Sequence, residues 1–190
     1  MSSLEIVGTI LGIVGVALMI RRNLWAFPIS LVQVVIFGWV CLGQRLYSDT
    51  LLQGMFFVAL VHGWWRWTHP GAGQVELPVQ ALTPIARGAW AAGTVLLWLV
   101  WGTMMHRATD AALPYGDGFV FAVSVSAQWL QARKKIENWP GWLVANTAAI
   151  AVFIAKDLFL FAALYAIFWV MAIWGWREWR RALRGGAAHA

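Results

Sequence analysis

Charged side chains are scarce in this sequence. Asp, Glu, Lys and Arg make up 12% of the 190 residues, about half of the share of roughly 25% that is usual in soluble proteins. So few charges do not cover a water-facing surface, which excludes an ordinary soluble domain. Cysteine is nearly absent as well. Cys41 alone excludes a disulfide within the chain, and because no ligand residues lie near it, we predict a packing role for it and no metal site.

The abundant residues are apolar, and they gather in long runs. Hydrophobic residues form 61% of the chain, and a transmembrane helix needs about 20 of them in succession. The runs are unbroken rather than alternating at every second residue, which favours helices over a β-barrel. The sequence therefore predicts an all-α integral membrane protein with seven transmembrane helices, near residues 4–20, 24–42, 49–66, 88–105, 115–132, 138–155 and 157–176.

The basic residues are distributed unevenly between the two ends of these helices. With the N-terminus outside, eleven Arg and Lys residues lie in the inner loops and the C-terminal segment, and three lie in the outer loops. Because basic residues concentrate on the cytoplasmic side, this asymmetry predicts an outside N-terminus and a cytoplasmic C-terminus. It also accounts for the net charge of +6, so we expect no nucleic-acid partner.

The second part of the chain repeats the first. A shift of 112 residues aligns residues 24–67 with 136–179 without a gap, and it carries the first predicted helix onto the fifth. Eleven aligned pairs are identical. The pairs that hydrophobic composition alone does not explain are Pro28/Pro140, Gly63/Gly175, Trp64/Trp176 and Trp67/Trp179.

Because the repeat is three helices long, a single connecting helix is needed to give both halves the same orientation. The sequence thus predicts a three-plus-one-plus-three parallel pseudo-repeat. In transporters of this kind the substrate binds between the halves, near the middle of the bilayer. The predicted parts are a first three-helix repeat at 1–67, a cytoplasmic linker at 68–87, a connecting helix at 88–105, a second repeat at 115–179 and a cytoplasmic tail at 180–190.

Polar side chains inside the spans mark candidate sites, because they are costly in lipid. Gln33, Gln53, Gln128 and Asn146 are the strongest, since an amide cannot easily satisfy all its donors and acceptors on its own helix. Hydrogen bonding between helices is the alternative role for each. No Asp or Glu lies in the middle of a span and no P-loop motif is present, which favours facilitated diffusion over ion-coupled or ATP-driven transport.

On the sixth predicted helix, Trp139, Trp142 and Asn146 are three and four residues apart, which places two indoles and one amide on one helical face. Such a face suits a flat heteroaromatic ligand, by stacking and by cation-π attraction if the ring is charged. The aligned residues of the first half are Phe27, Ser30 and Val34, so we expect an asymmetric site. The alternative is an interfacial Trp pair beside a buried amide.

Several motifs together resemble the PnuC family of bacterial vitamin transporters. They include Leu46-Tyr47-Ser48-Asp49 with Leu52-Gln53, Gly63-Trp64-Trp65-Arg66-Trp67, Ala127-Gln128 followed by Arg133-Lys134-Lys135-Ile136-Glu137-Asn138-Trp139, and the spacing Trp139-x-x-Trp142-x-x-x-Asn146. The resemblance implies a SWEET-like architecture in the bacterial inner membrane and facilitated uptake of nicotinamide riboside, trapped inside by phosphorylation. It also implies that Trp139, Trp142 and Asn146, with Gln128 and Gln53, bind the substrate.

Alternatives to this function remain open at the level of the sequence. Some members of the family carry thiamine or riboflavin, and a homotrimer is the assembly that the family suggests. A different class of function is a non-catalytic subunit of a membrane complex, which would copurify with a partner. We do not predict an enzyme, because no buried acid, base and nucleophile converge at one depth, and we predict no cofactor.

Overall fold

Seven helices account for nearly all of the chain, as the sequence predicts. The computed structural model describes residues 3–43, 47–71, 73–109 and 112–187. Within these ranges the extended backbone pairing is limited to one isolated bridge, between Gln80 and Lys135. The helices are α1 (Ser3–Ile20), α2 (Ala26–Gly43), α3 (Tyr47–Thr68), α4 (Pro84–Ala108), α5 (Pro114–Ala132), α6 (Asn138–Ala155) and α7 (Phe159–Ala187).

Two helices are longer than the sequence predicts, each for a local reason. Helix α4 begins at Pro84 because the Thr83 hydroxyl accepts a hydrogen bond from the Ala86 amide at 3.3 Å and Pro fits the first helical turn. Helix α7 continues to Ala187 through a stretch rich in Arg, Ala and Leu, which are good helix formers. The segment predicted as a tail is therefore helical up to that residue.

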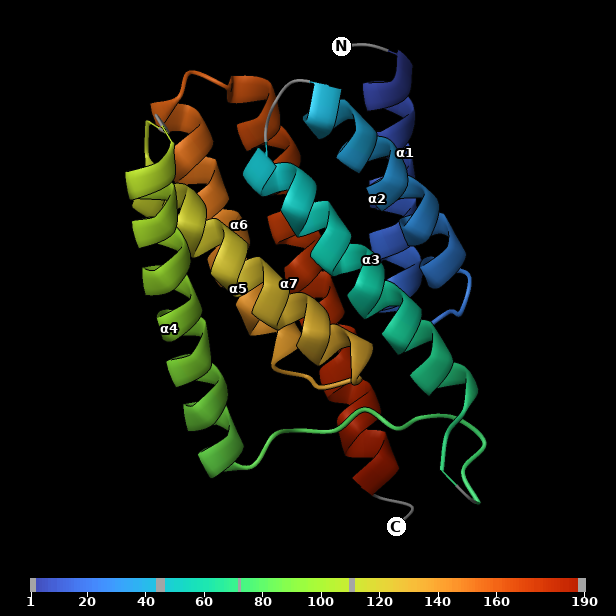
Figure 1. Ribbon diagram of the computed structural model, residues 1–190. Coiled ribbons are helices and arrows are strands. Elements are labelled where there is room, and N and C mark those ends of the chain that lie inside the picture. The colour runs from blue at the N-terminus through green and yellow to red at the C-terminus, as the bar shows by residue number, and fades with distance from the viewer. Residues whose placement is uncertain (1–2, 44–46, 72, 110–111, 188–190) are drawn as a thin grey trace.

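The helices are apolar enough for a membrane. By length and composition, α1, α2, α4 and α7 can each cross a bilayer. The N-terminus and the C-terminus lie at opposite ends of the bundle (Figure 1). We call the end with the C-terminus and the segment between α3 and α4 the linker side.

The bundle consists of two similar halves. Helices α1, α2 and α3 pack in sequence in the first half, and α5, α6 and α7 do so in the second. The first residues of α2 and α6 are 112 positions apart, and so are their last residues. The first residues of α3 and α7 have the same separation. The halves meet through α3 against α5 and α1 against α7, which are equivalent contacts under a two-fold exchange. The predicted parallel three-plus-one-plus-three repeat is confirmed, with α4 packed on α5 (Figure 1).

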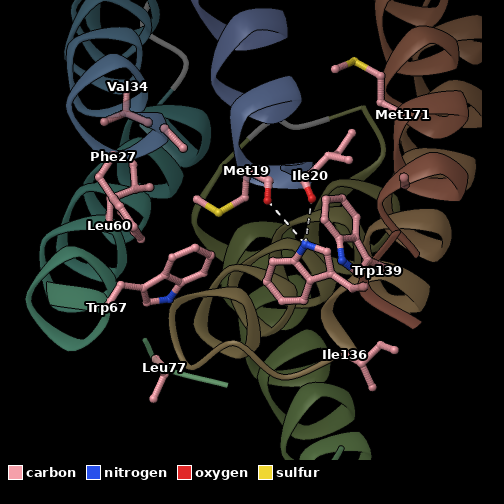
Figure 2. Packing of buried hydrophobic residues seen from close by; sticks show 13 residues of the cluster. Met19, Ile20, Phe27, Val34, Leu60, Trp67, Leu77, Ile136, Trp139 and Met171 are labelled. Carbon is pink, nitrogen blue, oxygen red and sulfur yellow. Dashed lines mark hydrogen bonds between the residues drawn. The ribbon is translucent and has the colours of Figure 1, made fainter. Parts of the chain in front are cut away.

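Reciprocal hydrogen bonds join the halves at the linker side. The Trp67 indole donates to the Ala132 carbonyl at 3.1 Å, and the Trp179 indole donates to the Ile20 carbonyl at 3.2 Å and to that of Met19 at 3.3 Å. The same 112-residue offset relates the Trp67–Ala132 bond to the Trp179–Ile20 bond. The two indoles also contact each other, with ring centroids 5.9 Å apart. Figure 2 shows this cluster, with dashed lines to the Met19 and Ile20 carbonyls.

Each of these indoles carries an edge-on aromatic neighbour from its own half. Phe27 meets Trp67 with centroids 5.1 Å apart, and its counterpart Trp139 meets Trp179 at 5.4 Å. The aromatic rings need room, which two glycines provide. A Cβ atom at Gly63 would lie 2.9 Å from the Phe27 ring and 3.0 Å from Ala132. One at Gly175 would overlap the Trp139 ring.

The segment between α3 and α4 breaks the symmetry, because it is pinned to the α5–α6 turn of the second half. The Gln80 amide donates to the Lys134 carbonyl, and the Gln80 carbonyl accepts from the Ile136 amide. Glu137 accepts from the Leu82 amide and pairs with Arg87 at 2.9 Å. The second half, this segment and α4 are thus fastened together.

Beneath the pinned segment lies a buried cation. Lys134 is 2% exposed, has a φ of 55°, and places its ammonium 4.5 Å from the centre of the Trp67 ring and 4.0 Å from a Glu76 carboxylate oxygen. Burial lowers the pKa of this ammonium, Glu76 raises it and Arg22 lowers it. Arg22, its counterpart in the first half, shares the left-handed backbone, with a φ of 57°.

The contact at Gly63 gives a test of the interface. We expect Gly63→Ala to destabilise the protein by about 1–3 kcal/mol, because the new methyl group is forced against Ala132 of the other half. The measurement is the apparent melting temperature in detergent. Gly54→Ala on the same helix is the control, since a Cβ there meets nothing within 4 Å and we expect an unchanged or higher value. Equal melting temperatures for the two variants would contradict the close approach.

Candidate functional site

The polar residues predicted for the site lie on the helices that form and flank the interface between the halves. Trp139, Trp142 and Asn146 come from α6, Gln128 from α5 and Gln53 from α3. The α6 face with the predicted spacing is turned inward, because Trp139 is 1% exposed, Asn146 is 3% exposed and Trp142 packs partly buried against the core. The sequence therefore identified the inner face of α6 correctly.

Trp139 belongs to the aromatic core more than to an open surface. Its ring covers Gly175 and meets Trp179 edge-on, which is the packing that Phe27 makes in the first half. Its indole nitrogen is buried without a hydrogen-bond partner among the described residues. In this arrangement the Trp139 ring offers no exposed stacking surface, and its free N–H is the group left for a ligand.

Trp142 is the indole that links the two halves beside this core. Its N–H donates to the Gln131 side-chain oxygen at 2.7 Å, and its ring meets Phe56 of α3 with centroids 5.8 Å apart. The hydrogen bond fixes the orientation of the indole plane, while the contact with Phe56 reaches the first half. Trp142 thus has a defined position at the meeting of α3, α5 and α6.

Gln131 and Phe56 were not among the predicted site residues. Gln131 lies at the end of a predicted span, where polar residues are common and do not indicate a site. Phe56 lies in an apolar run of α3, where its sequence context does not distinguish it from a packing residue. The spacing of Gln128 and Gln131, three residues apart on one helix, was the available signal for the first. Phe56 carried no signal beyond its identity with Phe168 in the repeat.

Two buried amides near this position have no partner. Gln128 is 7% exposed and Asn146 3% exposed, and no hydrogen bond of either side chain is found among the residues that the structure describes. On α3, the Gln53 side-chain oxygen is also buried and unpaired within the described ranges. A polar group that is buried without a partner costs about 1–3 kcal/mol, so these amides are candidates for hydrogen bonding to a ligand.

The predicted residues do not gather at a single depth. Helix α6 rises about 1.5 Å per residue, so Asn146 lies about 10 Å along the helix from Trp139. Gln53 is near the start of α3, at the end of the bundle opposite the linker side. The predicted residues are therefore spread along the bundle from the aromatic core past Trp142 and Asn146, with Gln53 farther from the linker side, and we call this set of residues the column.

The chemistry of this column is suited to binding. It offers amide donors and acceptors, an oriented indole and an indole N–H. Among the described residues, no three His, Cys, Asp or Glu side chains come together as metal ligands would. A flat ligand with hydrogen-bonding substituents matches these groups.

Comparison with known proteins places the chain among transporters. The family model described as nicotinamide mononucleotide transporter matches residues 2–181. The riboflavin/roseoflavin transporter RibM of Streptomyces davaonensis is 28% identical over 182 residues, which cover 92% of this chain and 83% of that protein. The nicotinamide riboside transporter PnuC of Escherichia coli is 25% identical over 215 residues, which cover 100% of this chain and 90% of that protein.

A solved structure has the same fold. The crystal structure of the vitamin B3 transporter PnuC superposes with a TM-score of 0.79 at 23% sequence identity, covering 95% of this chain and 82% of that one. At this identity the likeness concerns the arrangement of the helices.

Two neighbouring glutamines of α5 provide a matched test of the unpaired amides. We expect Gln128→Met to leave stability unchanged or raise it, because an amide without a partner is replaced by an apolar side chain. Gln131→Met should instead destabilise the protein by about 1–3 kcal/mol, because it leaves the Trp142 N–H unpaired. Apparent melting temperatures in detergent measure both. If Gln128→Met lowered the melting temperature more than Gln131→Met, the Gln128 side chain would not be the unpaired amide.

Proposed function

The chain belongs to the nicotinamide mononucleotide transporter family, and on that premise we propose that it takes up nicotinamide riboside by facilitated diffusion. It is a multi-pass transporter of a vitamin-type small molecule and not an enzyme. The observation that carries the proposed substrate is the pair of unpaired amides, Gln128 and Asn146, beside the oriented Trp142 indole. These groups match a flat, charged ring with polar substituents.

Nicotinamide riboside carries a pyridinium ring, a carboxamide and ribose hydroxyls. The carboxamide pairs with an amide side chain through a donor and an acceptor at once, which suits Asn146 or Gln128. The positive ring is held by the face of an indole, an attraction of about 2 kcal/mol when the cation is desolvated. Trp142 is the partly exposed indole of the column and supplies that face.

The proposed mechanism is alternating access between the two halves. In the structure Trp67 and Trp179 meet at the linker side and join the halves there. With the N-terminus outside and the C-terminus inside, as the basic residues predict, this contact closes the inner end of the path. Rocking of the first half against the second would separate the two indoles and open that end. No ion needs to be coupled to this motion.

Riboflavin is the second candidate substrate, because RibM is named for it and is 28% identical to this chain. Its ring system is flat but uncharged, so it would gain stacking without cation-π attraction. Thiamine is also a flat cation and satisfies the same chemistry. An alternative to all three substrates is that the chain is a non-catalytic subunit of a larger complex, in which case transport would require a second protein.

Uptake by the purified protein distinguishes these substrates. We expect proteoliposomes to accumulate labelled nicotinamide riboside above empty liposomes, without an ion gradient or ATP, and unlabelled riboside to compete. The same vesicles tested with labelled riboflavin and thiamine give the order of preference. Uptake of riboflavin alone would replace the proposed substrate, and no uptake of any of the three by the isolated chain would favour the subunit role.

Substitutions in the column test the proposed binding groups. We expect Asn146→Ala to weaken riboside binding about ten-fold through a lost hydrogen bond and Trp142→Ala to do so by a similar factor, roughly ten-fold, through the lost ring contact. Val144→Ala is the control, because Val144 is exposed on the outer face of the same helix. Binding is measured by isothermal titration on protein that elutes as the parent does. Parent-like affinity of both site variants would show that the substrate binds elsewhere.

A further inference from the structure

Helix α4 leaves a membrane-facing groove along its contact with α5. Among the described helices it packs against α5 alone, and the groove between the two has a volume of about 360 Å³. Small and apolar residues line it, among them Ala89, Gly93 and Leu97 of α4 and Val125 of α5. None of the residues of the proposed substrate column takes part in it.

The two hydroxyl groups in the groove wall are already hydrogen-bonded. The Thr94 hydroxyl donates to the Trp90 carbonyl at 2.8 Å and lies 2.7 Å from the Ser126 hydroxyl, which can therefore donate to it. Both hydroxyl protons are used in this arrangement, so the wall presents an apolar surface to an occupant. That surface suits a hydrocarbon chain better than a polar ligand.

A free cation stands at the linker-side end of the groove. Arg133, the residue after α5, lies with its guanidinium 5.9 Å from the centre of the Trp90 ring and 6.0 Å from that of Trp129. Both indoles line the groove. Arg133 is exposed and forms no ion pair with a described carboxylate, whereas nearby Arg87 is held by Glu137. Two aromatic rings therefore lie beside a charge that no described carboxylate neutralises, at the linker-side ends of α4 and α5.

We propose that this groove binds an anionic phospholipid, with one acyl chain between α4 and α5 and the headgroup phosphate on Arg133. Basic groups between helices at the inner surface attract anionic headgroups, and guanidinium groups bind phosphate through paired N–H donors. A second copy of the chain is a poorer occupant, because it would have to bring a carboxylate to Arg133 and only 8 of the 190 residues are acidic. The proposal is independent of which vitamin is carried.

Native mass spectrometry of the full chain, incubated with phosphatidylglycerol or phosphatidylcholine in detergent, tests the proposal. We expect phosphatidylglycerol to bind about five-fold more tightly, which is the preference that one basic residue at a membrane surface contributes. Arg133→Gln should remove this preference. Gly93→Leu should weaken the binding of both lipids, because a side chain there enters the groove without meeting any atom within 4 Å.

Two matched variants serve as controls. Gly88→Leu adds the same side chain to α4 outside the groove, again with nothing within 4 Å, and Arg184→Gln removes an exposed arginine from α7. We expect both to bind lipid as the parent does. If Arg133→Gln and Gly93→Leu also bind as the parent does, the groove is not a lipid site. If Gly93→Leu changes only the oligomeric state, the occupant is a second copy and the proposal is wrong.

Discussion

The structure depends on two indoles, Trp67 and Trp179, that each cap a helix of the other half with hydrogen bonds. The last carbonyls of an α-helix have no partner within the helix, and in a membrane protein such groups are costly to leave unpaired. Helix α1 ends at Ile20 and α5 ends at Ala132, and these carbonyls accept from Trp179 and Trp67. Each half therefore needs the other to complete a helix end.

The same contacts explain why the halves stay alike where they meet and differ elsewhere. Gly63 and Gly175 must remain small because rings lie against both of them. The segment that leads to α4 covers the α5–α6 turn, where Lys134 is buried, whereas its counterpart Arg22 stays partly exposed. The second half is thus fastened to α4, and the described part of the first half shows no equivalent attachment.

The fold was largely predictable from the sequence because its main determinants are local or repeated. Hydrophobic runs are set by the bilayer, and the repeat shows itself as a fixed offset. The site was less predictable, since it depends on which residues of different helices meet. Lys134 looked like a loop cation yet is buried, and the bond from Trp142 to Gln131 joins residues of two helices. The inward face of α6 could be predicted because spacing along a single helix defines it.

If the proposed site is right, the placement of paired and unpaired polar groups separates the stable part of the interface from the part that responds to a ligand. At the linker side, both interface indoles have acceptors, so this arrangement is stable without any ligand. Farther along the column, Asn146 and Gln128 have none within the described ranges, and a conformation that buries them unpaired is penalised. A ligand that pairs with these amides removes the penalty only where the column is formed around it. Its binding energy then shifts the population toward that conformation, and a transporter without an ion-coupled step can be driven by the substrate gradient alone.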